Sequence, residues 1–181
     1  YNNIGMIHDS KGEYEKALEY YLKSLEIENV VYGESHPNIA ASYNNIGIIY
    51  KAQEEYTKAL KYYQKAYDLY VASKSEFEIT ISSGNLGSIL INFQKYKESL
   101  YYSNIALNGY TKLGYKRYVA YPMESIAIVY DSLHQFKKAN INYIQAIKIH
   151  EENDNLFEVA QSANAYANCL LKQKKYIESI T

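Results

Sequence analysis

The chain repeats itself with a period of 40–42 residues, and this repetition constrains the fold more than any other feature. Tyr1–Ile27 aligns with Tyr43–Leu69 at a shift of 42, with about half of the positions identical. A shift of 40 continues the pattern, so that one small residue recurs at Gly47, Gly87, Ala127 and Ala167. Repetition at this period is typical of solenoids, in which each repeat is one supersecondary unit. The sequence therefore predicts stacked copies of a single unit.

Within each unit, the spacing of apolar residues predicts two amphipathic helices joined by a short polar turn. In the second unit, apolar side chains recur every three or four residues, as on one face of a helix. They are Ile39, Tyr43, Ile46 and Tyr50. The polar stretch KAQEE follows, and a second apolar stripe begins at Tyr56. We therefore predict an all-α chain of about nine to ten antiparallel helices, in units of approximately 1–34, 35–74, 75–114, 115–154 and 155–181.

Small residues recur in the first helix of each unit, where two helices must approach closely. A glycine inside a helix costs roughly 0.5–1 kcal/mol relative to alanine, so Gly5, Gly47 and Gly87 require a packing reason. We expect a bulky side chain opposite each small one, chiefly from the aromatic series that opens each second helix. That series is Tyr14, Tyr56, Tyr96, Phe136 and Tyr176.

Two prolines predict where first helices begin. Ser35 is expected to cap the first helix of the second unit, with Pro37 in the first turn, where proline is tolerated. Pro122 falls several residues inside the corresponding helix of the fourth unit by alignment. Because proline disrupts a helix interior, we predict that this helix starts late, near Tyr121.

The charge balance argues against nucleic acid and membranes as partners. Lys and Arg number 19 and Asp and Glu 20, the formal net charge is -1, and Arg117 is the only arginine. Phosphate and base recognition depends on clustered positive charge and on arginine in particular, so we expect no nucleic-acid binding. No apolar run approaches the roughly 18–20 residues that cross a bilayer, so we expect no membrane insertion.

Residues that could carry chemistry are scattered rather than clustered. The four histidines lie apart along the chain, without metal-binding spacing on one helix face, and Cys169 is the single cysteine. His8 aligns with Tyr50, so we interpret it as a packing residue. No phosphate-binding glycine loop or GxSxG turn is present. We therefore expect no metal, no cofactor and no catalysis, and the scarcity of cysteine fits a cytoplasmic location.

The most specific motif lies in the segment Tyr32–Tyr70, where G-x-x-H-P-x-x-A is followed by Y-N-N-I-G. On these residues the chain resembles the tetratricopeptide repeats, in the 40–42-residue form found in kinesin light chains and in many bacterial regulatory proteins. Later units, for example YTKLGYKRYVAYPMESIAIVY, look more like the repeats ahead of bacterial histidine kinases and transcription regulators. The resemblance covers essentially the whole chain. It implies an all-α, right-handed superhelical solenoid of antiparallel helix hairpins that serves as a binding scaffold.

The repeat alignment places both ends of the sequence inside helices. Tyr1 aligns with Tyr43, and Thr181 aligns with Lys61. We therefore expect a fragment of a longer array, truncated within repeats at both ends. Solenoids end in polar capping repeats, and we expect the exposed apolar faces of uncapped ends to promote end-to-end self-association.

The resemblance also implies a binding face. In this family the first helices of successive hairpins line a concave surface along which ligands lie. Carried over by alignment, the candidate peptide-binding residues are Asn3, Asn44, Asn45, Ile48, Lys51, Asn85, Ser88, Glu124, Asn164 and Asn168. Asn3, Asn45 and Asn85 occupy equivalent positions, and a carboxamide that both donates and accepts can hold a peptide backbone. Alternatively, these asparagines solvate the groove or bond a neighbouring helix.

The charges on this face suggest the chemistry of the ligand. Acidic side chains slightly outnumber basic ones, so we expect a neutral or basic apolar segment. The acidic residues are Asp9, Glu124 and Asp131, against Lys51 and Lys172. The family's carboxylate-binding version is not expected, because its lysine and arginine positions hold Asn2, Ile81 and Asn85 here.

The leading functional hypothesis is a protein–protein interaction scaffold that binds a peptide or partner segment along the concave groove. The alternative is a sensory or regulatory domain of a larger bacterial signalling protein, such as a histidine kinase or a peptide-responsive regulator. An enzyme would require residues that this sequence does not offer.

Overall fold

The computed structural model describes the backbone of residues 1–180, and the side chains of these residues except 177, 179 and 180. Over this range the chain is helical, without strands, which confirms the all-α prediction. The α-helices are α1 (Asn2–Ser10), α2 (Tyr14–Tyr32), α3 (Ala40–Ala52), α4 (Tyr56–Ser73), α5 (Glu76–Leu90), α6 (Tyr96–Lys112), α7 (Ala120–Ser132), α8 (Phe136–Glu152) and α9 (Leu156–Ile180). Three short 3₁₀ helices are η1 (Pro37–Ile39), η2 (Ile91–Phe93) and η3 (Lys116–Tyr118).

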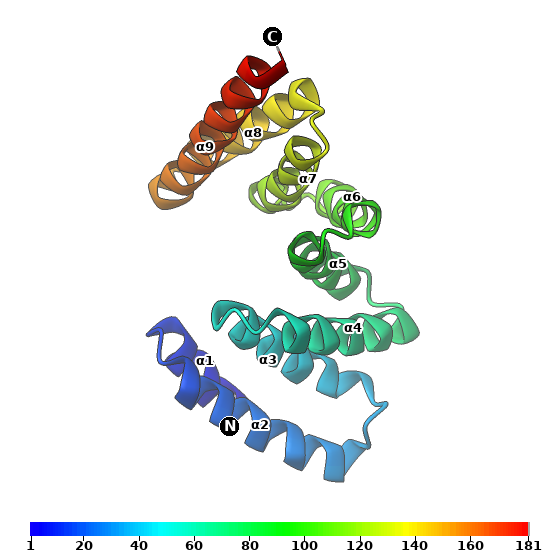
Figure 1. Ribbon diagram of the computed structural model, residues 1–181. Helices are drawn as coiled ribbons and strands as arrows, with labels where there is room; N and C mark the ends of the chain where they lie inside the picture. Colours follow the sequence, from blue (N-terminus) through cyan, green and yellow to red (C-terminus); the bar gives the residue numbers. More distant parts are fainter. Residues whose placement is uncertain (181) are drawn as a thin grey trace.

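Successive helices form hairpins, and the hairpins stack in chain order. α1 packs on α2, α3 on α4, α5 on α6 and α7 on α8, and each later first helix also packs on the second helix before it. The helices follow an arc that is open on one side, with α5 and α9 nearer the open side than α6 and α8 (Figure 1). α7 contacts both α5 and α9. The odd-numbered helices therefore line the inner face of the solenoid, as predicted.

Each connection between two successive α-helices contains one residue with a positive φ angle. Within hairpins these residues are Gly12, Glu54, Gln94 and His134, and between hairpins they are Gly33, Lys74, Gly114 and Asp154. Glycine adopts this conformation at the lowest cost, but five of these eight residues are not glycine. The packing of the helices on either side therefore holds the turn geometry where the turn residue alone does not favour it.

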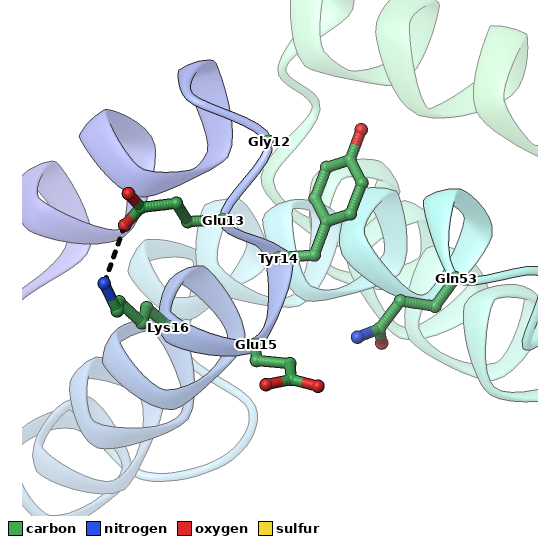
Figure 2. A pocket seen from close by; sticks show the side chains of 6 residues that line it. All are labelled: Gly12, Glu13, Tyr14, Glu15, Lys16 and Gln53. Carbon is green, nitrogen blue, oxygen red and sulfur yellow. Dashed lines mark hydrogen bonds and ion pairs between the residues drawn. The ribbon is translucent and has the colours of Figure 1, made fainter.

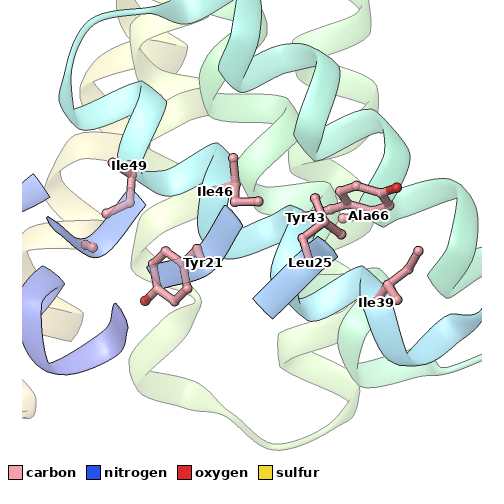
Figure 3. Close-up of a cluster of buried hydrophobic side chains, with 8 residues drawn as sticks. Tyr21, Leu25, Ile39, Tyr43, Ile46, Ile49 and Ala66 are labelled. Carbon is pink, nitrogen blue, oxygen red and sulfur yellow. The ribbon is translucent and has the colours of Figure 1, made fainter. Parts of the chain in front are cut away.

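The core between the first and second units contains Ile39, Tyr43 and Ile46 of the predicted apolar stripe, whereas the predicted Tyr50 is only half-buried and its neighbour Ile49 is buried. Figure 3 shows side chains of α2 and α3 meeting in this layer, and Ile39, Tyr43, Ile46 and Ile49 are 0–3% exposed. Burial of one such side chain contributes about 1.5–3 kcal/mol. Stacking of the hairpins therefore depends on this layer and on its equivalents in later units.

The aromatic side chains that face the small residues are not the series predicted from the sequence. A Cβ atom added to Gly5 would lie 2.7 Å from the ring of Tyr21, and one added to Gly47 would lie 2.7 Å from the ring of Tyr63. These tyrosines come seven residues, or two helical turns, after Tyr14 and Tyr56. The prediction was wrong because the two helices approach each other two turns into the second helix, away from its first residue.

The helix starts agree only in part with the prediction. The cap before Pro37 is His36 instead of Ser35, because His36 Nδ1 accepts a hydrogen bond from the backbone N–H of Asn38 at 3.2 Å. The first turn is the 3₁₀ helix η1, and α3 begins only after it. The late start of the fourth unit is confirmed, since α7 begins at Ala120, within one residue of the predicted start. Pro122 then lies in the first turn, where its missing N–H is not needed.

The last helix also differs from the repeat pattern. The alignment places a new helix at Tyr176, but α9 runs unbroken from Leu156 to Ile180. Lys174 and Glu178 pair along one face of this helix at 3.8 Å, and Gln173 Nε2 donates to Asn140 of α8 at 3.0 Å. These contacts and the helix-forming residues around them favour continuation over a turn. No helix in the described part of the chain is long and apolar enough to cross a membrane.

Candidate functional site

A hollow of about 340 Å³ opens on the inner face between α5 and α7, with Lys51 contributed by α3 and Tyr110 by α6. We call it the Gly84 hollow. Four of its lining residues are among those predicted from the sequence, namely Lys51, Asn85, Ser88 and Glu124. The other lining residues are Ile81, Gly84, Tyr110, Tyr121, Pro122, Ser125 and Ile128. The structure therefore brings together predicted residues from three different units.

The remaining predicted residues lie outside this hollow. Asn3 and Ile48 are exposed on α1 and α3, and Asn44 and Asn45 are half-buried on α3. Asn164 and Asn168 are exposed on α9. A binding face that used all ten residues would therefore extend along several inner helices and not only over the hollow.

The asparagines bond to one another across neighbouring inner helices. Asn45 Nδ2 donates to Asn2 Oδ1 at 3.1 Å, and Asn85 Nδ2 donates to Asn44 Oδ1 at 2.8 Å. Of the interpretations left open by the sequence, these contacts match a bond to a neighbouring helix. The Asn85 carboxamide still has one N–H and its oxygen for a further partner.

The run of asparagine pairs stops where the hollow opens. The next pair in the series would join Gly84 and Ser125, which align with Asn44 and Asn85. Gly84 has no side chain, and Ser125 Oγ donates to the backbone oxygen of Tyr121 in its own helix at 3.3 Å. The hollow therefore occupies the place of a missing side-chain bridge, and the alignment of Asn44 with Gly84 was the sequence signal that could have located it.

Lys51 is the positively charged residue of the hollow. Its ammonium donates to Ser88 Oγ at 2.6 Å, and the surrounding protein lowers the pKa of this lysine by desolvation, although the residue as a whole is exposed. Among the residues that the structure describes, Lys51 takes part in no ion pair. The ammonium therefore has a neutral partner and retains two N–H donors.

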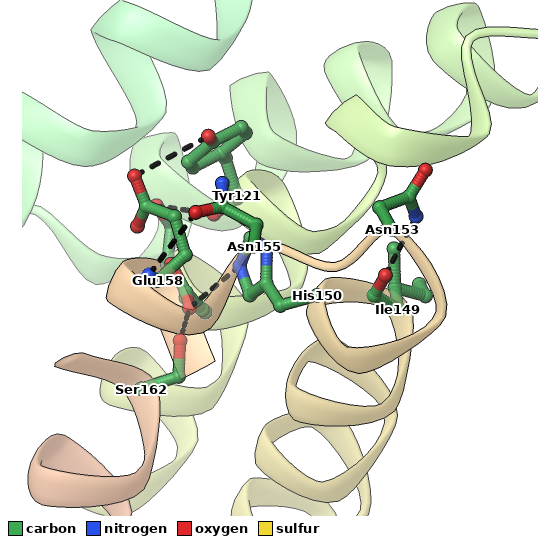
Figure 4. A network of polar contacts seen from close by, with 9 residues as sticks. Tyr121, Ile149, His150, Asn153, Asn155, Glu158 and Ser162 are labelled. Carbon is green, nitrogen blue, oxygen red and sulfur yellow. Dashed lines mark hydrogen bonds and ion pairs between the residues drawn. The ribbon is translucent and has the colours of Figure 1, made fainter. Parts of the chain in front are cut away.

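Glu124 is held on the opposite side by residues of α8 and α9. Ser162 Oγ donates to Glu124, and His150 Nε2 lies 3.3 Å from the same carboxylate oxygen. Figure 4 shows His150 and Ser162 in this network of polar contacts. His150 is 2% exposed, and the ring of Tyr121 packs edge-on against it at 5.4 Å. Burial is the main cause that raises the pKa of Glu124, while the contacts with Ser162 and His150 oppose it. One oxygen of the carboxylate is therefore already bonded to Ser162 within the protein.

Sequence reasoning did not identify His150 and Ser162 as site residues. They lie in different helices, 26 and 38 residues after Glu124, and no short motif joins them. His8, in contrast, was interpreted correctly. Its ring stacks on Tyr20 at 5.3 Å, as the equivalent Tyr50 stacks on Tyr62 at 5.5 Å.

A second depression, of about 380 Å³, lies at the hairpin turns of the first two units. Figure 2 shows its lining by residues 12–16 and Gln53, with the carboxylate of Glu13 paired with Lys16 at 3.1 Å. Its only positive charge is thereby matched. In the described part of the chain, no group of three or more His, Cys, Asp or Glu residues is placed to hold a metal ion.

Comparison with known proteins shows which folds this chain resembles. A tetratricopeptide repeat family model matches residues 1–70. No curated protein matches the sequence. Among solved structures, the chain is similar to a Rap protein complexed with Competence and Sporulation Factor, with 18% identity, a TM-score of 0.83, and coverage of 99% of this chain and 50% of that one.

Two further structures show the same architecture. BtubC (BKLC) from P. vanneervenii is 21% identical, with a TM-score of 0.74 and coverage of 85% of this chain and 63% of that one. Putative kinesin light chain nearly identical TPR-like repeats from Podosopora anserina are 14% identical, with a TM-score of 0.68 and coverage of 98% and 93%. The chain therefore spans only 50% of the Rap protein and 63% of BtubC. At these identities the likeness establishes the fold.

Proposed function

We propose that the inner face of this chain binds an extended segment of a protein partner. The proposal is supported by the tetratricopeptide repeat match over residues 1–70 and by the similarity of the whole fold to solved repeat structures. In this proposal the segment crosses α3, α5 and α7 and uses the Gly84 hollow as its central subsite. The partner is a protein or peptide, and the chain itself catalyses no reaction. Its cytoplasmic location remains a prediction.

The observation that carries the proposal is the interruption of the asparagine pairs at Gly84. Between α1 and α3, and between α3 and α5, asparagine side chains bridge the neighbouring helices. At Gly84 they leave a hollow of about 340 Å³, lined by both apolar and hydrogen-bonding groups. Ligand sites in proteins have this character, being concave and mostly apolar with a few placed polar groups.

The test is to fill the hollow without disturbing the helices. A Cβ atom added to Gly84 would have only the Cβ atom of Ala106 nearby, at an ordinary contact distance of 3.6 Å. Gly84→Leu should therefore keep the fold while its side chain occupies the hollow. The matched control is Asn104→Leu, at an exposed position on the outer helix α6.

A displayed library of random peptides is selected on the wild-type chain and on both variants. We expect the wild type and Asn104→Leu to enrich related peptides, and Gly84→Leu to lose them while its circular dichroism and melting temperature stay near those of the wild type. Peptides that bind a folded Gly84→Leu equally well would refute the assignment of the hollow. Failure of the wild type to enrich any peptide would refute the proposed function.

A second candidate function is regulatory, in which ligand binding changes the curvature of the arc and thereby the state of a larger bacterial signalling protein. It is supported by the high structural similarity to the Rap protein, whose structure was determined with a bound factor. Small-angle scattering with and without a selected peptide tests it. A change in radius of gyration supports a regulatory domain, and an unchanged value supports a static scaffold.

A further inference from the structure

The bridge between α7 and α9 differs from the asparagine bridges of the inner face because it can take up a proton. Asn45 donates to Asn2 between α3 and α1, and Asn85 donates to Asn44 between α5 and α3. Glu124 aligns with Asn44 and takes the equivalent place on α7. A carboxamide carries no charge, whereas a carboxyl group gains or loses one with pH. This bridge is therefore sensitive to pH where the asparagine bridges are not.

The partners of Glu124 come from the two helices that follow it. Ser162 of α9 donates to one carboxylate oxygen, and Nε2 of His150 on α8 lies 3.3 Å from the same oxygen. His150 is 2% exposed, and its Nε2 atom has no hydrogen-bond partner among the described residues. A buried ring nitrogen without a hydrogen bond is costly, and a proton on the ring turns this contact into an ion pair.

The pair of Glu124 and His150 is best satisfied when it holds one proton. With that proton, the pair is either an imidazolium beside a carboxylate or a neutral ring beside a neutral acid, and no charge is left unmatched. Without it, a half-buried carboxylate faces an uncharged ring, and the hydroxyl of Ser162 is its one remaining partner among the described residues. A charge withdrawn from water without a counter-charge destabilises the packing around it.

The first half of α9 depends on this bridge because few side chains of the helix are buried. Among its described side chains, Ser162, Cys169 and Gln173 are buried. Cys169 and Gln173 hold the second half of the helix against α7 and α8. Ser162 is the buried side chain of the first half, and its partner is Glu124.

Other ionisable groups surround the pair on every neighbouring element. They are Tyr121 on α7, Glu158 on α9, Arg117 in η3 and Asp154 in the α8–α9 connection. Burial is the main cause that raises the pKa of Glu124, and the negative charge of Glu158 adds to it. Arg117 stays charged at every ordinary pH, and burial raises the pKa of Tyr121 above its ordinary value of 10.0. The proton that is exchanged near neutral pH therefore belongs to the pair.

We propose that Glu124, His150 and Ser162 form a proton-dependent latch, which fixes the first half of α9 to α7 and α8 at acidic pH and loosens as the pH rises. The latched state binds the proton more tightly than the open state. Its contribution is fully present below the ordinary carboxyl pKa of 4.5 and is lost as the pH rises through the raised value. Because Glu124 also lines the Gly84 hollow, the latch lies at the edge of the inner face.

Hydrogen exchange of the whole chain, measured by mass spectrometry on peptides that cover residues 156–166, tests the latch. Rates are converted to protection factors, because the intrinsic exchange rate itself changes with pH. In the wild type, protection of residues 156–166 should fall about tenfold from pH 5 to pH 8, the change in an opening equilibrium that a pKa difference of one unit produces. Protection of α3 should stay constant, because its asparagine bridges do not titrate.

Four variants separate the latch from other causes of pH dependence. Glu124→Gln introduces the carboxamide of the other bridges, and both this variant and His150→Gln should lose the fall in protection. His36→Gln, at an exposed position beside η1, and His134→Gln, whose native ring stacks on Tyr176 of α9 at 4.3 Å, should retain it. Constant protection in the wild type, a fall that persists in Glu124→Gln or His150→Gln, or a fall that disappears in either control would overturn the proposal.

A second measurement on the wild type needs no variant. The imidazole signals of the four histidines are followed by NMR over the same pH range. The signals of His150 should shift where the protection of residues 156–166 falls. Signals of His150 that stay constant through that range would also overturn the latch.

Discussion

The second and third units have the same hairpin design but pack it differently. In the α3–α4 hairpin, Gly47 faces the ring of Tyr63, so an aromatic side chain separates the two backbones. In the α5–α6 hairpin, the equivalent pair is Gly87 and Ser103, and a Cβ atom added to Gly87 would lie 2.9 Å from the backbone nitrogen of Ser103. The backbones of the third unit are therefore in near contact.

Further small side chains maintain this close approach. Ser99 Oγ donates to the backbone oxygen of Gly87 at 2.7 Å, and a Cβ atom on Gly109 would meet Thr80. The same helix α5 carries Gly84, which lines the hollow. The comparison teaches that small residues in one repeat have two effects. Between the helices of a hairpin they allow the backbones to approach closely, and on the inner face they leave space for a ligand.

The largest expected effect on the free energy of unfolding is the difference between substitutions at Tyr63 and at the equivalent Ser103. Tyr63 is 1% exposed and fills the space between its helices, so Tyr63→Ala should destabilise by about 4 kcal/mol through lost burial and a cavity. The Oγ atom of the equivalent Ser103 is buried without a hydrogen-bond partner among the described residues, so Ser103→Ala should be neutral or slightly stabilising. Urea unfolding of both variants measures the contrast. Similar losses for both variants would mean that the two hairpins pack alike.

The next effect concerns the glycines themselves. Gly87→Ala should destabilise by about 3 kcal/mol, because its Cβ atom meets backbone that cannot move independently. Gly47→Ala should cost about 1–2 kcal/mol, since the ring of Tyr63 can shift slightly. The fourth unit is a natural control, because there Ala127 packs with Tyr143 in one buried cluster. A larger loss for Gly47→Ala than for Gly87→Ala, by thermal or urea unfolding, would contradict this order.

A smaller effect is expected at Gly84. Its added Cβ atom makes only an ordinary contact with Ala106, so Gly84→Ala should stabilise the chain by about 0.5–1 kcal/mol through the helix preference of alanine. The opposite sign from Gly87→Ala, three residues away on α5, would be visible in paired melting curves. Destabilisation by Gly84→Ala would show that the hollow is already filled by neighbouring side chains.

The smallest effect depends on pH. Burial raises the pKa of Glu124 above its ordinary value of 4.5, so the folded chain holds this proton more tightly than the unfolded chain. The resulting stability is fully present below the ordinary pKa and is lost as the pH rises through the raised folded value. The glutamine of Glu124→Gln does not titrate, so the variant does not lose this stability. Its free energy of unfolding should therefore rise relative to that of the wild type as the pH increases from the ordinary pKa through the raised folded pKa. Urea unfolding from pH 4 to 8 measures the difference, and parallel curves would contradict it.

The sequence was sufficient to predict the fold because the repeat is carried by many residues at once. The stripe that includes Ile39, Tyr43 and Ile46 recurs at helical spacing and is buried as predicted. Single residues were less predictable. His36 replaced Ser35 as a cap through its own bond to the Asn38 N–H. α9 did not break before Tyr176, and there Gln173 bonds to Asn140 of the neighbouring helix α8.

The inner face was predictable as a surface but not as a site. Alignment placed Lys51, Asn85 and Glu124 on it, and the structure brings them around one hollow. The partners that decide their chemistry come from elsewhere, as with His150 beside Glu124. Spacing along a helix predicts which side chains share a face, whereas pairing between helices depends on their packing distance, which the sequence does not state.

The most direct test of the account is a crystal structure of the chain with a peptide selected on it. The account predicts peptide density on the inner face across α5 and α7, with a side chain of the peptide seated in the Gly84 hollow. A peptide seated on the outer helices α4, α6 and α8, with the Gly84 hollow left open, would contradict it.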